Sequence, residues 1–207
     1  MKSIVLFKNN LRYNDNPVLK TAIEKSSLIL PVFIQDEINF NKNLGGASKY
    51  WLYHSLNSLN ESLQNNLLFF SGDTIKILNK LIDSHNINKV YCEEAFLIED
   101  VKFYDRLKLT LLNKGVKLYQ LNSTLLWKPY DILKKDLTPY KVFTPFYKRG
   151  CLEYSEPEHP VGEPYSPKYL TCPIRTSLND LNLLGNIQWY EKFNSKWDIS
   201  EKAALDI

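Results

Sequence analysis

The 207-residue sequence lacks the features that mark secreted, membrane-bound or zinc-binding proteins. Its three cysteines, Cys92, Cys151 and Cys172, are widely spaced, with no Cys-x-x-Cys pair and no neighbouring histidines. This pattern indicates neither a disulfide framework nor a zinc site. No apolar run approaches the roughly 18 residues of a membrane helix, and the N-terminus has no signal-peptide core. We therefore expect a cytoplasmic protein without a bound metal and without a membrane partner.

The sequence also lacks a strong excess of either charge. Its 26 basic and 23 acidic residues give a net charge of +3, and the basic residues do not form a run that would indicate a nucleic-acid partner. A Walker loop and a Gly-x-Gly-x-x-Gly motif are both missing, which disfavours a dinucleotide after the first strand. His54, His85 and His159 lie far apart, so we expect surface or hydrogen-bonded histidines rather than ligands.

What the sequence does have is a regular alternation of strand-like and helix-like segments. Short apolar runs predict strands at Ile4–Phe7, Leu28–Ile34, Leu67–Phe70, Lys89–Cys92 and Val116–Leu121. Helical spacing predicts helices at Pro17–Lys25, Ser48–Asn65, Thr74–Ser84 and Glu99–Asn113. This order predicts an α/β fold, a Rossmann-like doubly wound five-stranded parallel sheet with helices on both faces, followed by an extended linker.

The character of the chain changes after about Leu126. Residues 127–149 are rich in aromatic residues and lysine, with a short helix expected near Pro145–Arg149. Five prolines within residues 153–173 predict an extended connector, and a new helix is expected to begin at Ser200. We divide the chain into an α/β domain (1–150), an interdomain linker (151–195) and the start of a truncated helical domain (196–207).

Four segments, in order, resemble the DNA photolyase/cryptochrome family. The segment that follows the first strand has the family's Leu-Arg-x-x-Asp-Asn-Pro-x-Leu pattern, although Leu6 and Lys8 replace its usual Trp and Arg. The other three segments are Gly46–Leu56, the heptapeptide Tyr140–Phe146, and Leu178–Trp189 with Trp197 and Glu201–Ala204. The last of them resembles the opening of the family's helical domain, with Ser200 in place of the usual Gly.

The resemblance implies a function as well as a fold. In this family the α/β domain binds an antenna chromophore, methenyltetrahydrofolate or a deazaflavin, and a helical domain holds FAD and damaged DNA. The antenna passes light energy to reduced FAD, which splits a pyrimidine dimer; the family is therefore a light-driven carbon–carbon lyase. The segments that bind FAD and the lesion lie beyond residue 207, so no residue here is assigned as catalytic. We expect the chain to be inactive alone, to need an FAD-binding helical domain on the same or a separate chain, and to meet DNA only indirectly.

Five residues are candidates for binding the antenna chromophore. Asp36 follows the second strand, Gly46 and Ser48 begin the second long helix, and Glu93 and Glu94 follow the fourth strand. Carboxylates there could accept hydrogen bonds from ring N–H groups. The alternatives are a capping or loop role for Asp36, an N-cap role for Ser48, and exposed loop acids at positions 93 and 94.

Four further residues are candidates for an interdomain surface: Arg12, Tyr140, Phe143 and Phe146. Arg12 could instead form a salt bridge with Asp15 or Asp36. The aromatic residues lie among lysines and could bind single-stranded nucleic acid, although the resemblance places them near the domain junction. We expect the aromatic residues of the helix predicted at Ser48–Asn65 to lie in the core rather than in a cofactor site; they are Tyr50, Trp51 and Tyr53. Other functions left open are a stand-alone folate-, flavin- or nucleotide-binding module, a cryptochrome-type photoreceptor fragment, and a decayed gene product.

Overall fold

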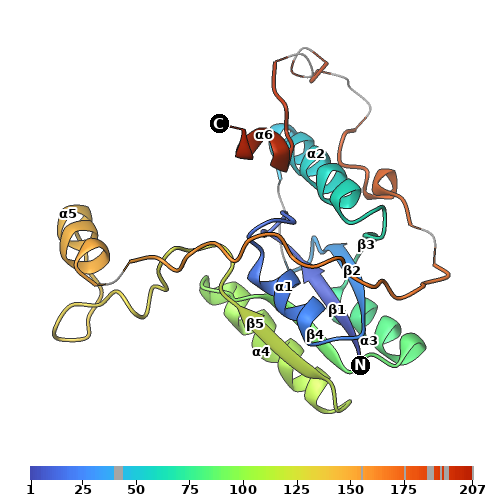
Figure 1. Cartoon of the computed structure of the whole chain (residues 1–207), viewed down its shortest axis with the longest axis horizontal. Coiled ribbons are helices and arrows are strands. Elements are labelled where there is room, and N and C mark those ends of the chain that lie inside the picture. Colours follow the sequence, from blue (N-terminus) through green and yellow to red (C-terminus); the bar gives the residue numbers. More distant parts are fainter. Residues whose placement is uncertain are drawn as a thin grey trace.

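The computed structural model of the chain describes residues 1–39, 44–154, 156–174, 176–185, 189–191, 193 and 196–206. Its centre is a parallel sheet with the strand order β3-β2-β1-β4-β5 (Figure 1). The strands are β1 (Lys2–Phe7), β2 (Leu28–Gln35), β3 (Leu68–Ser71), β4 (Lys89–Glu93) and β5 (Lys117–Leu121). The predicted five-stranded parallel sheet is confirmed, with every strand within two residues of its expected bounds.

Two helices cover each face of the sheet. On one face lie α1 (Pro17–Glu24) and α2 (Gly46–Ser62), and on the other lie α3 (Thr74–His85) and α4 (Ile98–Leu112). The two faces carry separate cores: Leu19, Leu56 and Leu59 belong to the first, whereas Leu78 and Leu107 belong to the second. The doubly wound architecture expected from the sequence is therefore confirmed.

Strand β1 shows why the first apolar run has no polar alternation. Ile4 and Leu6 pack into the core under α3 and α4, whereas Val5 and Phe7 pack into the core under α1 and α2. All four side chains are buried. A strand covered on both faces must be apolar at successive positions, as this one is.

Helices α1 and α3 begin at side-chain caps, whereas α2 and α4 have no side-chain cap. The Asn16 side chain accepts a hydrogen bond from the Leu19 amide at 3.1 Å, and Asp73 caps α3 in the same way. The N-cap role considered for Ser48 as an alternative is wrong. Gly45 occupies the N-cap position, and Ser48 lies exposed within the first turn.

The face that α2 turns to the core also differs from the expectation. Tyr50 is buried and Tyr53 is partly buried. Trp51, expected in the core, has half of its surface exposed and lies edge-on to Trp197. The register of α2 is set by Leu56, Leu59 and Tyr50, which turns Trp51 toward the C-terminal segment.

After β5 the chain leaves the sheet as a long arm, residues 122–154. Its tip carries the short helix α5 (Phe143–Pro145) and the π-helical turn η1 (Phe146–Leu152), well away from the sheet (Figure 1). The tip has a small core of its own, in which Ile132, Gly150 and Cys151 are buried and Tyr140 lies against Gly150. The helix expected near Pro145–Arg149 is present as α5 and η1.

The chain then returns across the domain in extended form. Residues 156–174 carry the prolines and form one parallel bridge, between Ile29 and Tyr169. Strand β3 pairs with β2 only from Val32 onward, so the connector occupies the place beside Ile29. The 3₁₀-helix η2 (Leu178–Leu181) packs on β3, and helix α6 (Glu201–Leu205) packs on α2. The extended connector is confirmed; the domain boundaries at residues 150 and 195 stay predictions.

Gly150 is the tightest point of the arm tip, which leads to a prediction. A Cβ atom at this position would lie 2.6 Å from Cγ2 of Ile132 and 3.1 Å from Cε2 of Tyr140. We expect Gly150→Ala to destabilise the tip by about 1–3 kcal/mol through overpacking. Limited proteolysis of the arm checks this, with the exposed neighbour Arg149→Ala as the control. Wild-type resistance of the Gly150→Ala arm would contradict the proposed packing.

Candidate functional site at the carboxyl edge of the sheet

The carboxyl ends of β1 and β4 form the switch point of the sheet. These strands are neighbours, but β1 leads to α1 on one face and β4 leads to α4 on the other. Open α/β sheets bind their ligands in the crevice at such a point. Lys8 and Asn9 follow β1 there, and Glu93 is the last residue of β4.

Glu93 is a buried carboxylate with half of its hydrogen-bonding capacity unused. Its side chain is 4% exposed, and its Oε1 accepts bonds from Asn9, from Nδ2 at 2.5 Å and from the backbone amide at 3.3 Å. Its Oε2 is buried and has no hydrogen-bond partner among the described residues. An unpaired buried acceptor costs free energy, so this atom is suited to a donor from outside the chain.

The charges around Glu93 leave its pKa above the ordinary value. Burial raises the pKa, the positive charge of Lys8 and the hydrogen bonds from Asn9 lower it, and the nearby Asp100 raises it again. Lys8 also forms a 2.8 Å ion pair with Asp100. A carboxylate held at raised pKa beside an organised cation is a common feature of functional sites.

Glu94, the next residue, has a different environment. Its Oε1 accepts a hydrogen bond from the Tyr130 hydroxyl at 2.8 Å, and its Oε2 lies 3.8 Å from the Lys128 ammonium group. Both partners belong to the base of the arm. Glu94 therefore ties the arm to the sheet in this structure, and it is neither unpaired nor merely exposed.

Asp36 is fully occupied by its own loop and by α3. Its carboxylate accepts hydrogen bonds from the amides of Ile38, Asn39 and Thr74 and from Asn39 Nδ2, at 2.8–3.1 Å. Burial raises the pKa of Asp36, but these bonds outweigh it and the pKa lies below the ordinary value. The loop role weighed for Asp36 describes its contacts, and a role toward a chromophore stays a prediction.

The other two chromophore candidates lie on α2. Gly46 packs against Trp189: a Cβ atom there would lie 3.1 Å from the indole ring. Ser48 is exposed on the same turn. Neither residue is among the hydrogen-bond partners of Asp36 or Glu93. The structure therefore does not join the five candidates in one cluster of contacts, and their binding roles stay predictions.

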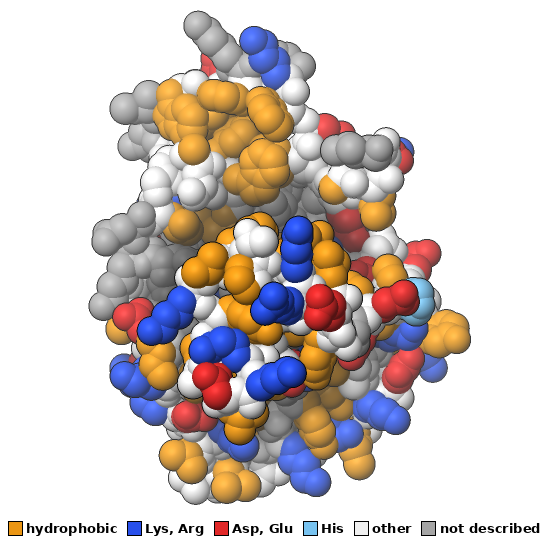
Figure 2. Space-filling view, turned by 90° about the vertical axis from the view of Figure 1, so that its left-hand side faces the viewer, with side chains coloured by type: hydrophobic (Ala, Val, Ile, Leu, Met, Phe, Trp, Pro, Cys, Tyr) orange, Lys and Arg blue, Asp and Glu red, His pale blue; other side chains and the backbone are white. Residues whose placement is uncertain are grey.

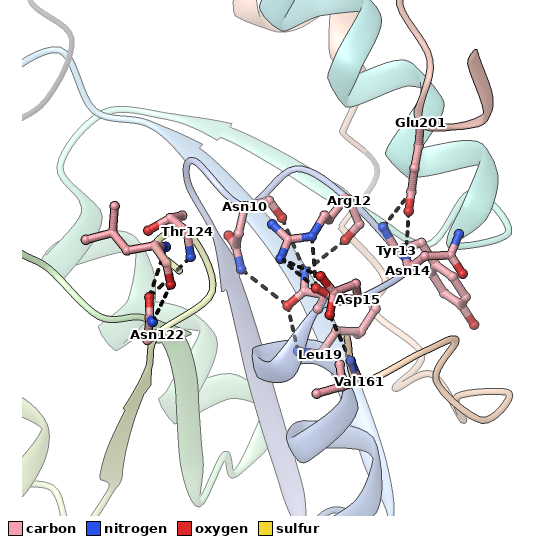
Figure 3. A network of polar contacts seen from close by, with 12 residues as sticks. Asn10, Arg12, Tyr13, Asn14, Asp15, Leu19, Asn122, Thr124, Val161 and Glu201 are labelled. Carbon is pink, nitrogen blue, oxygen red and sulfur yellow. Dashed lines mark hydrogen bonds and ion pairs between the residues drawn. The ribbon is translucent and has the colours of Figure 1, made fainter. Parts of the chain in front are cut away.

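Arg12 organises the loop after β1 rather than projecting from it. Its Nε and Nη2 donate to the carbonyl oxygen of Asp15 at 2.9 and 2.6 Å, and the two side chains form an ion pair at 3.6 Å (Figure 3). The Asn16 side chain donates to the Arg12 carbonyl oxygen at 2.8 Å. The salt bridge to Asp15 considered from the sequence is present; an interdomain role for Arg12 stays a prediction.

A polar hollow beside this loop was not foreseen from the sequence. It encloses about 240 Å³ between Arg12, the segment after β5 and the returning connector, with Ser123, Trp127 and His159 in its lining. Ser123 is buried, and its hydroxyl has no hydrogen-bond partner among the described residues. Three segments far apart in sequence form the hollow, so no local motif could have indicated it.

The arm tip, well away from the sheet (Figure 1), carries the three aromatic candidates in two pairs of ring contacts. Tyr140 and Phe146 lie edge-to-face at 6.3 Å, and Phe143 stacks on Tyr147 at 5.7 Å. Phe143 is 73% exposed. Figure 2, which looks onto the end of the arm, shows hydrophobic side chains interspersed with lysine and arginine. Basic residues of this segment are Lys134, Lys135, Lys141, Lys148 and Arg149.

Two further kinds of feature are absent from the described part of the chain. No group of three or more His, Cys, Asp or Glu side chains there is arranged to hold a metal ion. Among the same residues, no helix has the length and apolar character needed to cross a bilayer.

Fold and switch-point site together define a Rossmann-like α/β domain with a buried carboxylate at the carboxyl edge of its sheet. The DNA photolyase family model matches residues 3–165, and the chain belongs to this family. A deoxyribodipyrimidine photo-lyase from Agrobacterium fabrum is 32% identical over 98% of this chain and 43% of its own length. Cryptochrome-2 of Arabidopsis thaliana is 29% identical over 74% of this chain and 26% of its own.

Solved structures agree with this assignment. A bacterial class III photolyase from Agrobacterium tumefaciens matches 99% of this chain and 43% of its own, with a TM-score of 0.90 and 31% identity. An archaeal photolyase from Sulfolobus tokodaii, at 20% identity and a TM-score of 0.70, shares the fold. The chain spans less than half the length of these relatives.

The raised pKa of Glu93 predicts a pH-dependent cost to stability. Because the folded state holds this proton more tightly than the unfolded state, stability falls as pH rises from the unfolded pKa through the folded one. We expect Glu93→Gln to melt at a higher temperature than the wild type at neutral pH, and this advantage to shrink in acid. Thermal denaturation of both proteins from acid to neutral pH checks this prediction, with Glu99→Gln, a change at an exposed residue, as the control. A Glu93→Gln variant that is less stable at neutral pH would contradict the prediction.

Proposed function

We propose that this chain is the light-harvesting part of a deoxyribodipyrimidine photolyase-like DNA repair protein. It would act with an FAD-binding helical domain, on the same or a separate chain, and would meet damaged DNA only through that domain. Family membership supports the photolyase-like assignment. The observation that carries the antenna role is the buried, unpaired Oε2 of Glu93 at the switch point.

The chemistry of this acceptor fits an antenna chromophore of the proposed kind. Methenyltetrahydrofolate and deazaflavins carry polar heterocyclic rings, and a ring N–H brought to Oε2 would remove the cost of its unmade hydrogen bond. A bound antenna would supply absorption of near-UV or blue light. Glu93 would orient the ring, while Asn9 holds the other carboxylate oxygen and Lys8 supplies positive charge. Asp36 and Glu94 are weaker candidates, because their carboxylates already have hydrogen-bond partners. Gly46 and Ser48 also stay weaker candidates.

The relatives support two candidate light-dependent functions, one as a photolyase antenna and one as a photoreceptor fragment. The Sulfolobus tokodaii photolyase holds two FAD molecules, which implies a novel light-harvesting cofactor in that protein and keeps a flavin among the candidate antennas here. The similarity to cryptochrome-2 favours a second candidate function, a cryptochrome-type photoreceptor fragment. The two functions differ in the chemistry of the FAD-binding half, whereas the proposed role of Glu93 is the same in both.

The arm tip supports the proposed partner. Phe143, Val142 and Leu152 are exposed apolar side chains on a segment that holds its own small core. Exposed apolar clusters of this kind mark protein interaction surfaces. We infer that Tyr140, Phe143 and Phe146 shape a surface that the helical domain covers.

Chromophore binding is tested directly with the purified chain. The chain is incubated with methenyltetrahydrofolate or, separately, with a deazaflavin, and unbound chromophore is removed by gel filtration. The protein fraction should then carry near-UV or blue absorption that separates from it on denaturation. We expect Glu93→Gln to bind about tenfold more weakly, because it loses a charge-assisted hydrogen bond, although its fold is more stable. Glu99→Gln should bind as the wild type does. Binding of neither chromophore, or equal binding by Glu93→Gln, would argue against the antenna site.

The partner surface predicts self-association of the chain on its own. Phe143→Ser should lower the fraction of dimers and larger species in sedimentation velocity, because it removes the most exposed aromatic side chain of the tip. Leu109→Ser on α4 is a matched control, since Leu109 is 64% exposed and Phe143 is 73% exposed. A wild-type chain that stays monomeric at high concentration would count against a covered surface at the tip.

A further inference from the structure

Glu201, the first residue of α6, binds the loop after β1. Its Oε2 accepts a hydrogen bond from the amide of Tyr13 and its Oε1 accepts one from the amide of Asn14, both at 2.6 Å (Figure 3). Each carboxylate oxygen thus has its own backbone donor, across 187 and 188 positions of sequence. Hydrogen bonds from amides to a carboxylate are stronger than those between neutral groups.

The loop that offers these two amides is held from its other side. Asp15 accepts a hydrogen bond from the Val161 amide at 2.9 Å, and its own amide donates to the Gly162 carbonyl oxygen at 3.3 Å. Arg12 fixes the Asp15 carbonyl oxygen. The amides of Tyr13 and Asn14 therefore belong to a loop that the connector and Arg12 already hold.

Helix α6 depends on such contacts because it is short. It has five residues, and isolated helices of this length are not stable in water. Ser200 caps it by accepting a hydrogen bond from Ala203 at 3.1 Å, and the Glu201 amide donates to the Ser58 hydroxyl at 3.3 Å. The bonds from Glu201 to the loop are the shortest that join α6 to the rest of the described chain.

We propose that Glu201 is a positioning residue, a latch whose carboxylate fixes α6, and with it the direction of the polypeptide that follows, on the α/β domain. The orientation of a helical domain after α6 rests on the function proposed above; the latch itself does not. Loop amides at the carboxyl edge of a parallel sheet are where α/β folds bind anionic ligands. Here an internal carboxylate occupies that place, so removing it should leave two amides able to bind a small carboxylate.

Hydrogen exchange in the existing chain tests the latch. In Glu201→Ala, exchange at the amides of Tyr13 and Asn14 should accelerate about tenfold, as expected for the loss of a charge-assisted bond. The amides of β1 should keep their protection. Added formate should restore protection at these two amides in the variant and leave the wild type unchanged. Asp198→Ala, which removes an exposed acid of the same segment, is the control.

A second variant guards against a general loss of structure. Glu201→Gln keeps the size of the side chain and one acceptor oxygen, so it should give a smaller acceleration confined to residues 13 and 14. The latch is overturned if neither variant changes exchange at these amides, if Asp198→Ala changes it equally, or if formate has no effect on Glu201→Ala. The readout needs no chromophore and no partner, so a failure of the proposed antenna role leaves it unaffected.

Discussion

The structure depends on the double burial of β1. This strand pairs with β2 on one side and β4 on the other, and cores cover both of its faces. Its end is therefore the point where the chain passes abruptly from core to solvent, and polar groups buried there are stabilised by hydrogen-bond partners. Asn9 meets Glu93, Arg12 meets Asp15, and Asn16 caps α1. The connector and α6 attach to the same loop, so the outer segments take their places from the centre of the sheet.

Two buried acids at this edge, Asp36 and Glu93, differ in the number of hydrogen bonds that they receive. This difference separates a structural role from a candidate binding role. Asp36 is 2% exposed and receives bonds on both oxygens, so its charged form is favoured despite burial. Glu93 is 4% exposed, but its donors meet one oxygen only, and burial raises its pKa by more than these bonds lower it. The arrangement at Asp36, with donors on both carboxylate oxygens, would stabilise the fold more than the arrangement at Glu93. A site that keeps an unmet acceptor gives up stability, and such a loss is typical of positions retained for binding.

Most of the fold could be predicted because its determinants are local. A doubly buried strand is apolar at each position, and Asn16 with Pro17 indicates where a helix begins. The register of α2 was less predictable, since Gly45 serves as the cap and tertiary packing, not spacing, turns Trp51 outward. The contacts of Glu94 with Tyr130 and of Glu201 with Tyr13 join positions with no common pattern in the sequence. Acidic residues could be recognised as candidates, but not the partners that give each a different role.

The tip of the arm is held by its own packing, so it can keep aromatic residues exposed in a way that a flexible segment could not. Apolar side chains on a mobile chain tend to collapse onto the nearest core, because burial lowers their free energy. At the tip, Ile132 and Cys151 are buried, and Gly150 in η1 allows Ile132 and Tyr140 to pack closely against it. Phe143 therefore stays exposed on a preformed surface. A tip that is already ordered loses little conformational entropy when it binds a partner. A preformed tip therefore favours a tight and specific contact.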